Sequence, residues 1–510
     1  MARAALRRRT VRAASAPRRG RFVPRVLGIV LAAEAVALAA FAAAAAFTRD
    51  PVVGFAGGAA VAGALAAVLL LLGRRADEPS RREALASVLA LWLVLPAVGV
   101  APYLASGAMG PVDALFESMS GFTSTGATAL QEFGAFGPVT FLWRAFTQWV
   151  GGIGIIVLFI AVFPQLAIAG RQLFFTEMPG PTEDRFTPRL QQTASAVLRI
   201  YVGATLAAAV AYLLAGMGPF DAVAHALTTL AAGGFSPEPR SFEGFGPAVQ
   251  WVAIVFMAVA GVNFALQVRV WSGRAGLLPR DPEVRTYLAI ALAGGTAMAV
   301  LTAGAYGADA LRHGLFQSLS ILTTTGYASV DFGAWTPRAQ TIVVLLAFVG
   351  GSAGSAAGGM KVVRWIIIAR NTAREVRRVL HPRAVLPVRV GRRTVPEEVL
   401  RSVAAFVTLY VGLFATGTAA LALLGSDFTT AFSASIGALG NVGPGLGAVG
   451  PMEHYGGLPA AAKLLLTFLM YAGRLEVVAV FVVLTRAWWR VPRRWRSPDA
   501  RRVGRPPTAR

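Results

Sequence analysis

Residues 320–332 read SILTTTGYASVDF and place three threonines, a glycine and a tyrosine between two long apolar segments. The chain has 510 residues, of which 55% are hydrophobic and only 14% are charged, too few charges for a soluble protein of this size. Apolar runs such as Val26–Phe47, Val52–Leu72 and Leu85–Leu104 approach or exceed the ~20 residues that span a bilayer. The composition predicts an all-α polytopic membrane protein, in which a short polar segment between spans needs an explanation.

Several chemistries are excluded by residues that the chain lacks. It has no cysteine, which rules out disulfides, zinc–thiolate sites and cysteine nucleophiles. Its four histidines are scattered without metal-binding spacing; they are His225, His313, His381 and His454. No convergent set of catalytic side chains is visible inside the spans, so the sequence predicts no enzyme.

The net charge of +23 comes from arginines that alternate with the apolar spans. They crowd the N-terminus up to Arg25, the segments 74–82 and 364–393, and the tail after Arg486. This is the positive-inside pattern, which puts both termini in the cytoplasm. The clusters can also contact anionic lipid. They lack interleaved aromatic platforms, so no nucleic-acid partner is expected.

The apolar segments divide the chain into about ten spanning helices. The expected spans are 26–48, 52–73, 84–105, 139–165, 193–216, 247–272, 284–307, 338–370 with an interruption, 399–424 and 457–487. The first span is interpreted as retained, not as a cleaved signal peptide. The predicted divisions are a basic cytoplasmic N-terminus (1–25), two extra spans (26–83), four repeats (84–192, 193–283, 284–398 and 399–487) and a basic cytoplasmic tail (488–510).

The polar segment occurs in four degenerate copies, each after a helix too short to cross the bilayer. The copies read ALFESMSGFTSTGATAL, AVAHALTTLAAGGFSPE, GLFQSLSILTTTGYASV and AFSASIGALGNVGPGLG. Aligning the glycines at 126, 233, 326 and 443 gives spacings of 107, 93 and 117 residues, with one extra residue needed in the fourth copy. The predicted unit is helix, pore loop and helix, repeated four times around a central pore and preceded by the two extra spans.

Irregular backbone at membrane depth is tolerated only where protein buries it or where it lines an aqueous path. Four such turns around one axis can form a ring of carbonyls that replaces the water shell of a cation. Glycine lets the carbonyls point inward without a Cβ clash, and the half-helix before each turn aims its negative end at the ion. The alternative for any single copy is an ordinary polar extracellular loop.

Further motifs carry a resemblance to a known family. They are QWVGGIGI (148–155), AGVNFAL (260–266), GGSAGSAAGGMKVVR (350–364), HPRAVLPVR (381–389), NVGPGLG (441–447) and GRLEV (473–477). With the four loops, these segments resemble the TrkH/KtrB/HKT family of potassium transporters, in which a simple K⁺-channel subunit is repeated four times in one chain. Because the chain has two extra N-terminal spans, it resembles the TrkH branch of this family more than the shorter KtrB branch.

The resemblance implies a selectivity filter, and therefore a K⁺-binding site, in the four loops. Its residues would be Thr125, Gly126, Ala232, Gly233, Thr325, Gly326, Asn441, Val442 and Gly443. Ala232 departs from the family pattern, in which threonine is frequent, and leaves a backbone carbonyl without a side-chain oxygen. In related plant transporters a serine at the first position accompanies Na⁺ preference, so Gly126 favours K⁺.

The eighth span is interrupted by GGSAGSAAGGM (350–360), which has five glycines in eleven residues. One interpretation is tight helix packing through GxxxG steps. The other, which the resemblance implies, is an unwound gating loop beneath the filter, with Lys361 and Arg364 at the cytoplasmic edge. The gate residues would be Gly350, Gly351, Gly354, Gly358, Gly359 and Arg474.

Arg474 lies within the otherwise apolar tenth span, where a charge usually faces a cavity or a partner. A structural ion pair with Glu476 or another acid is one possibility, although residues two apart on a helix point in different directions. The resemblance implies instead an electrostatic barrier to cations near the gate.

The expected outer loops carry acids that could concentrate cations at the pore mouth. They are Asp113, Glu117, Glu132, Asp221, Glu238, Glu243, Asp331, Asp427 and Glu453. Most could equally be ordinary solvated loop charges. Asp113, Asp221 and Asp427 each start a pore half-helix and are alternatively N-caps.

The resemblance implies the ion-conducting subunit of a TrkH-type potassium uptake system in a bacterial inner membrane. It implies a homodimer with a TrkA-like cytoplasmic nucleotide-binding subunit, and no cofactor besides the transported K⁺. A Na⁺-selective or mixed Na⁺/K⁺ member of the family is an alternative. A second is a broken-helix secondary symporter, which predicts inverted repeats. Whether transport is coupled to H⁺ or Na⁺ is left open.

Overall fold

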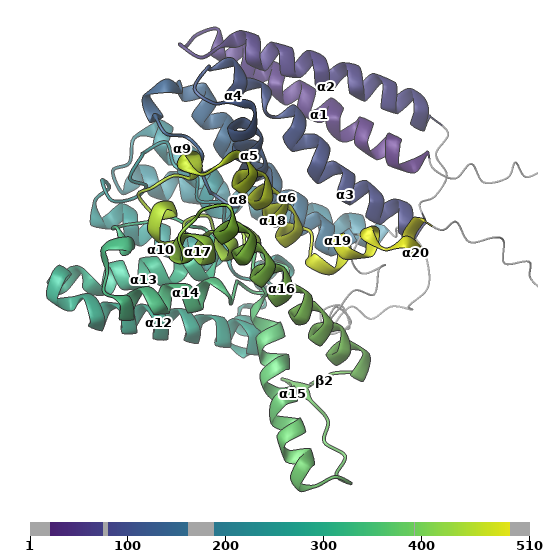
Figure 1. Cartoon of the computed structure of the whole chain (residues 1–510), viewed down its shortest axis with the longest axis vertical. Helices are drawn as coiled ribbons and strands as arrows, with labels where there is room; N and C mark the ends of the chain where they lie inside the picture. The colour runs from purple at the N-terminus through teal and green to yellow at the C-terminus, as the bar shows by residue number, and fades with distance from the viewer. Residues whose placement is uncertain (1–20, 75–79, 162–187, 392, 490–510) are drawn as a thin grey trace, which may run out of the picture.

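The computed structural model describes residues 21–74, 80–161, 188–391 and 393–489 (Figure 1). Among these residues the only strands are the two-residue pair β1 (Arg389–Val390) and β2 (Arg393–Thr394). The basic segment 1–20, the residues 75–79 and the tail 490–510, on which part of the predicted charge pattern rests, lie outside the described residues. The described fold is helical throughout its body.

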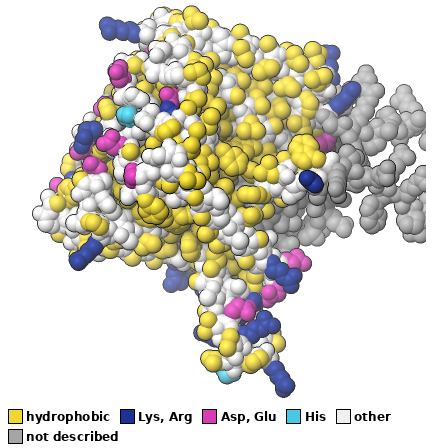
Figure 2. Space-filling model, in the orientation of Figure 1, with side chains coloured by type: hydrophobic (Ala, Val, Ile, Leu, Met, Phe, Trp, Pro, Cys, Tyr) yellow, Lys and Arg dark blue, Asp and Glu magenta, His cyan; other side chains and the backbone are white. Residues whose placement is uncertain are grey.

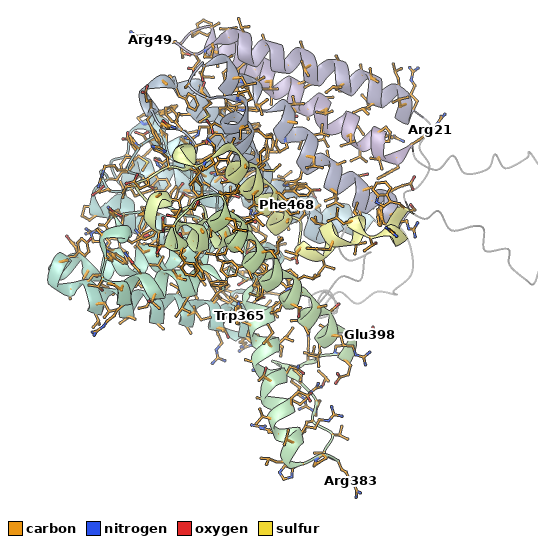
Figure 3. All side chains as sticks on the ribbon, in the orientation of Figure 1. Arg21, Arg49, Trp365, Arg383, Glu398 and Phe468 are labelled. Atoms are coloured by element: carbon orange, nitrogen blue, oxygen red, sulfur yellow. The ribbon has the colours of Figure 1, made fainter. Side chains whose placement is uncertain are left out.

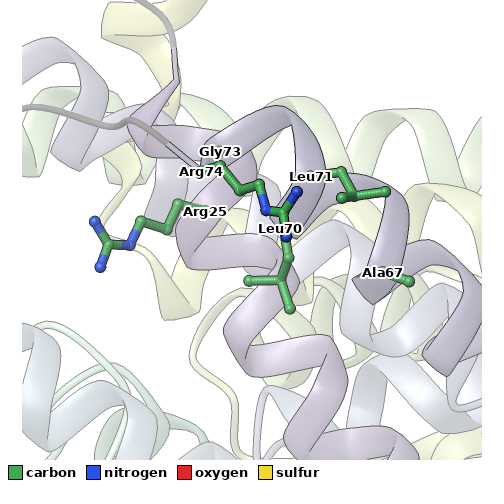
Figure 4. A pocket seen from close by; sticks show the side chains of 6 residues that line it. All are labelled: Arg25, Ala67, Leu70, Leu71, Gly73 and Arg74. Carbon is green, nitrogen blue, oxygen red and sulfur yellow. The ribbon is translucent and has the colours of Figure 1, made fainter.

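The two extra N-terminal helices form an antiparallel pair along one side of the molecule (Figure 1). They are α1 (Phe22–Ala45) and α2 (Val52–Gly73). Glycines allow their close approach, since a Cβ added at Gly28 would lie 2.8 Å from Leu70 Cγ. A shallow pocket where the two helices end, lined by Arg25, Ala67, Leu70, Leu71, Gly73 and Arg74, is drawn in Figure 4. None of its lining residues belongs to a polar loop.

Four units of outer helix, pore half-helix and return helix follow. Unit 1 contains α3 (Arg81–Val98), α4 (Ala101–Ala105), α5 (Pro111–Phe122) and α6 (Pro138–Ala161). Unit 2 contains α8 (Pro188–Leu214), α9 (Pro219–Leu230), α10 (Pro247–Ala260) and α11 (Phe264–Trp271). Unit 3 contains α12 (Pro282–Tyr306), α13 (Ala310–Leu322), α14 (Pro337–Ala347) and α15 (Val362–Leu380). Unit 4 contains α16 (Glu397–Leu423), α17 (Phe428–Leu439), α18 (Ala460–Arg474) and α19 (Val477–Leu484), and the short α20 (Arg486–Trp489) follows it.

Six stretches of the described chain are long and apolar enough to cross a membrane, and two bent helix pairs raise that number to eight. The prediction of continuous sixth and tenth spans is wrong. The pair α10–α11 bends by 101° and the pair α18–α19 by 109°. In the first bend Asn263 accepts a hydrogen bond from Leu266 N and caps a new helix, and in the second Glu476 adopts a φ of 67°. The predicted interruption of the eighth span is confirmed, because α14 ends at Ala347 and α15 begins at Val362.

Hydrophobic side chains are spread over the visible face of the body, as expected for lipid contact (Figure 2). Only the first residues of α15 are buried, and the rest of this helix projects from the body with the β1–β2 pair beside it (Figure 1). Trp365 marks its base and Arg383 lies near its tip (Figure 3). The arginine-rich segment predicted from 364 to 393 is therefore a protruding arm.

Candidate functional site

The four polar loops that follow the pore half-helices have the same backbone structure. They are loop 1 (123–130), loop 2 (231–238), loop 3 (323–330) and loop 4 (440–447). Each half-helix ends two residues before a left-handed residue, and a glycine with positive φ follows two residues later. The left-handed residues are Ser124 (φ 50°), Ala232 (51°), Thr324 (57°) and Asn441 (53°). The glycines are Gly126 (φ 83°), Gly234 (79°), Gly326 (83°) and Gly443 (96°).

Backbone hydrogen bonds give the same register. In every loop the residue before this glycine donates from its N–H to the carbonyl five residues earlier. These bonds are Thr125 to Ser120 (2.8 Å), Gly233 to Thr228 (2.9 Å), Thr325 to Ser320 (2.8 Å) and Val442 to Gly437 (2.8 Å). The repeated sequences therefore fold into one repeated turn.

This register corrects the predicted alignment of loop 2 by one residue. Gly234, and not Gly233, is equivalent to Gly126 and the other positive-φ glycines. Ala232 takes the left-handed position, and Gly233 stands where loops 1 and 3 have threonine. The sequence AAGG offers two adjacent glycines, and only the backbone angle distinguishes them. In loop 4, Gly443 occupies the expected position.

The four glycines lie against one another's loops in a closed cycle. A Cβ added at any of them would come within 3.0 Å of a carbonyl oxygen of the next loop. The pairs are Gly126 with Gly233 O, Gly234 with Thr325 O, Gly326 with Val442 O, and Gly443 with Thr125 O. Because the cycle runs from loop 1 through loops 2, 3 and 4 back to loop 1, the loops surround a common centre. Any side chain at these positions would collide with that ring of carbonyls.

Loops 1 and 3 brace themselves with threonine hydroxyls. Thr123 and Thr125 share a hydrogen bond of 2.7 Å, and Thr323 and Thr325 share one of the same length. The matching distances show that these two loops are the most alike of the four.

Loops 2 and 4, which lack this threonine pair, are held by amide side chains. Gln148 of α6 donates from Nε2 to Gly233 O (2.6 Å) and accepts at Oε1 from Phe235 N (3.1 Å). Asn441 donates from Nδ2 to Thr125 Oγ1 (2.9 Å), which joins loop 4 to loop 1. Gln148 was missed as a site residue, although the motif QWVGGIGI contained it.

The glycine-rich segment between α14 and α15 (348–361, the intramembrane loop) packs directly against the polar loops. Gly358 donates from its N–H to Thr324 Oγ1 (2.6 Å), and a Cβ at Gly358 would collide with Gly440 O. Gly350, Gly354 and Gly359 have positive φ. The segment is therefore irregular backbone, and the alternative of continuous helix packing through GxxxG steps is wrong.

Arg474, at the C-terminal end of α18, joins three parts of the site and is only 3% exposed. It donates to Ala356 O of the intramembrane loop (3.0 Å), to Ser124 Oγ of loop 1 (3.2 Å) and to Gly151 O of α6 (3.3 Å). Among the described residues no carboxylate forms a salt bridge with it. The positive charge is therefore buried next to the loops and held by neutral oxygens.

Glu476 pairs with Arg364 of α15, with Nη2 and Oε2 2.5 Å apart. The predicted alternative of an ion pair between Arg474 and Glu476 is therefore wrong. Lys361 and Arg364, which were predicted at the cytoplasmic edge, are both buried, with only 4% and 7% of their surface exposed. The bend after Arg474 brings Glu476 to Arg364, a contact that a straight span does not provide.

Glu283 at the start of α12 is a further residue that the sequence did not single out. Its Oε1 accepts hydrogen bonds from Ala353 N (2.8 Å) and Val363 N (3.1 Å), and the residue is 5% exposed. One carboxylate therefore fixes the intramembrane loop and the first turn of α15 together.

The predicted acids have different fates. Asp427 is an N-cap as expected, accepting from Thr430 N. Asp113 and Asp221 are not N-caps, because Gly110 and Gly218 hold that position and proline begins each helix. Glu117 is fully buried and paired with Arg144, and so is no vestibule charge. Four of the acids are exposed: Glu132, Glu238, Glu243 and Glu453. For these the acidic vestibule stays a prediction.

Comparison with known proteins gives a consistent likeness. The chain matches the family TrkH, described as cation transport protein, over residues 54–289 and 300–488. It is 36% identical over 491 residues to the Trk system potassium uptake protein TrkH of Vibrio parahaemolyticus, covering 92% of this chain and 99% of that protein. It is 38% identical over 434 residues to the protein of the same name from Halomonas elongata, covering 83% and 89%.

A solved structure shares the fold. The crystal structure of the potassium transporter TrkH from Vibrio parahaemolyticus matches with a TM-score of 0.84 at 34% identity, covering 92% of this chain and 99% of that chain. This likeness confirms the predicted all-α, multi-pass membrane fold with four repeats and two extra N-terminal helices.

Proposed function

Since the chain belongs to the TrkH family of cation transport proteins, we propose that it is the ion-conducting transmembrane subunit of a TrkH-type potassium uptake system. Like its relatives, it is a transport protein and not an enzyme. The observation that carries the proposal is the closed cycle of four glycines and four carbonyls. Such a ring can replace the hydration shell of a desolvated K⁺.

The proposed filter consists of the loop residues predicted from the sequence together with Gly234, which the backbone structure of loop 2 adds. Its residues are Thr125, Gly126, Ala232, Gly233, Gly234, Thr325, Gly326, Asn441, Val442 and Gly443. The pore half-helices end at these loops, so their negative C-terminal dipoles favour a cation there. The loops differ in side chains, so the proposed ion sites are fewer or weaker than in a fourfold symmetric channel.

The proposed gate is the intramembrane loop together with Arg474. Its residues are Gly350, Gly351, Gly354, Gly358, Gly359 and Arg474. The contact of Gly358 with Thr324, and the bond of Arg474 to Ala356 O, support a loop that closes the route beneath the filter. The buried guanidinium adds a like charge that a passing K⁺ would have to approach.

We propose that the protein is a homodimer in a bacterial inner membrane and that both of its termini are cytoplasmic. The proposed domains are the predicted ones, namely the two extra N-terminal helices and the four repeats between a basic N-terminus and a basic tail. A TrkA-like nucleotide-binding subunit is the proposed regulator. The projecting, arginine-rich α15 arm is the surface that favours such a partner, because it lies outside the apolar body (Figure 2). The bonds of Glu283 and Arg364 connect the base of this arm to the proposed gate.

Growth of a K⁺-uptake-deficient bacterium at limiting K⁺ tests the proposed function. The wild-type chain, expressed with its regulatory subunit, should restore growth. Gly326→Ser should not, because its Cβ would collide with Val442 O. Gly304→Ser is the matched control, since Gly304 of α12 is exposed with nothing within 4 Å of an added Cβ.

Absence of rescue by membrane-inserted wild-type protein would contradict the proposal. The ratio of Rb⁺ uptake to Na⁺ uptake, measured in proteoliposomes, then distinguishes a K⁺-selective protein from a Na⁺-selective or mixed member of the family. A broken-helix symporter is less well supported, because the four loops repeat in one orientation.

Glu283→Gln should raise Rb⁺ flux through proteoliposomes in the absence of the regulator. The amide loses the charge that strengthens two hydrogen bonds to the intramembrane loop and α15, each worth about 1.5–3 kcal/mol when charged. We expect a rise of several-fold. Glu398→Gln, at an exposed position near the start of α16 (Figure 3), is the control and should leave flux unchanged. Equal flux in the two variants would remove Glu283 from the gate.

A further inference from the structure

Behind the polar loops, α5 and α6 are joined by a buried ion pair. Arg144 Nη2 lies 2.7 Å from Glu117 Oε1, and Nε donates to the same oxygen (2.8 Å). Arg144 is 2% exposed and Glu117 is fully buried. Such a pair carries a large desolvation cost, so it stabilises the protein only when its remaining hydrogen bonds are also satisfied.

Those remaining hydrogen bonds go to two different loops. In loop 1, Thr128 Oγ1 donates to Glu117 (3.1 Å) and accepts from Arg144 Nη2 (3.2 Å), and Ala129 N donates to Glu117 Oε2 (2.8 Å). In loop 2, Ser236 O accepts from Arg144 Nη1 (3.2 Å). Thr128 and Ser236 each lie two residues beyond the glycine of their loop. The pair therefore links equivalent points of neighbouring loops.

The corrected register shows which half of this arrangement is repeated. Nine residues before the loop glycines stand Glu117, His225, Gln317 and Ala434. His225 Nε2 shares a hydrogen bond with Ser236 Oγ (3.0 Å). Gln317, with its amide oriented so that both of its polar atoms are satisfied, donates to Tyr327 O (3.2 Å) and accepts from Ser329 N (2.8 Å). In units 1 to 3, then, a pore half-helix side chain holds its own loop from behind.

The arginine has no counterpart. A proline precedes or begins each return helix, and the equivalent position is the sixth residue after it. The residues at this position are Arg144, Ala253, Val343 and Leu465. Only the junction of loops 1 and 2 thus carries a guanidinium at this position. It is also the junction where loop 2 has two consecutive glycines, and Arg144 stacks on the adjacent Phe235 with 4.1 Å from Cζ to the ring centroid. Consecutive glycines have the greatest backbone freedom, so this loop most needs an external support.

We propose that Glu117 and Arg144 are positioning residues that set ion selectivity, by fixing the separation of loops 1 and 2 so that their carbonyls do not close around an ion smaller than K⁺. The pair touches no ion itself and acts through Thr128, Ala129 and Ser236. This inference rests on the proposed filter function.

The test measures the ratio of Rb⁺ to Na⁺ uptake by purified protein in proteoliposomes. The double variant Glu117→Gln/Arg144→Gln removes both charges and leaves neither unpaired. Its ratio should fall about tenfold, the equivalent of ~1.4 kcal/mol of discrimination, while Rb⁺ uptake persists. Arg144→Lys keeps the positive charge beside Glu117 but loses the planar fork, so its ratio should fall between those of the wild type and the double variant.

Asp113→Asn/Lys463→Gln is the matched control, because this ion pair also joins α5 to a return helix but contacts none of the four loops. Its ratio should equal that of the wild type. A wild-type ratio in both Glu117→Gln/Arg144→Gln and Arg144→Lys would overturn the inference. Should the double variant fail to purify as folded protein, the ratio of Arg144→Lys alone decides. Failure of the wild type to take up Rb⁺ would instead contradict the proposed function itself.

Discussion

Replacing Gly234 with alanine should abolish Rb⁺ uptake in proteoliposomes and growth at limiting K⁺. Gly234 has a φ of 79°, and its added Cβ would come within 3.0 Å of Thr325 O, one of the four carbonyls of the ring. Neither atom can move away without opening the cycle, because both belong to backbone that the neighbouring loops hold. A left-handed alanine costs about 1–2 kcal/mol before any collision is counted. We expect uptake to fall by more than about 100-fold, which needs only ~2.7 kcal/mol in total.

The same change at Gly233 makes this a test of the register. An alanine Cβ there would meet the side-chain amide of Gln148, which can shift, and Gly233 does not have a positive φ. Gly233→Ala should therefore retain measurable uptake. Gly244→Ala, in the same outer connection with open space around it, should transport like the wild type. If Gly233→Ala were inactive and Gly234→Ala active, the alignment of loop 2 would have to return to the sequence-based one.

Arg474→Ala should raise the Rb⁺ flux, measured without the regulatory subunit, by about tenfold or more. A hydrogen bond to a charged group is worth about 1.5–3 kcal/mol, and ~1.4 kcal/mol corresponds to a tenfold change, so the loss of one such bond is enough. Arg474 joins Ala356 O of the intramembrane loop to Ser124 Oγ of loop 1 and Gly151 O of α6. Alanine removes these bonds and the buried charge together, so the proposed gate loses both its anchor and its electrostatic barrier.

Arg474→Lys separates the two contributions. Lysine keeps the charge but cannot span three oxygens with a planar fork, so we expect a flux between those of the wild type and Arg474→Ala. Arg338→Ala, at an exposed position at the start of α14, is the control for removal of an arginine. Flux through Arg474→Ala that matches the Arg338→Ala control would exclude Arg474 from the gate.

The sequence predicted the membrane class, the four repeats, the polar loops and the broken eighth span, because each leaves a signal in composition or spacing. It failed where the backbone decides between similar residues. AAGG in loop 2 gave the wrong glycine, and the bend after Arg474 is made by Glu476, a residue type that seldom marks a break. Glutamate in an expected outer loop was grouped with solvated acids, whereas Glu117 has its partner 27 residues away on another helix.

The contacts that the sequence could not supply are those between units. Gln148 reaches loop 2 from α6, and Glu283 reaches the intramembrane loop from α12, over separations of 85 and 70 residues. No local pattern predicts which side chain crosses such a distance. The motifs QWVGGIGI and GGSAGSAAGGM nevertheless located the segments that take part in these contacts.

The closed cycle of loops also has a consequence for biosynthesis. Its last contact joins loop 4 to loop 1, and the accompanying hydrogen bond from Asn441 to Thr125 spans 316 residues. A chain emerging from the ribosome has inserted three units before that contact can form. Until then Thr125 and Gly126 face an open side of the ring. A chain that ends before loop 4 therefore lacks the contact that closes the ring, so the complete cycle forms only when all four units are present.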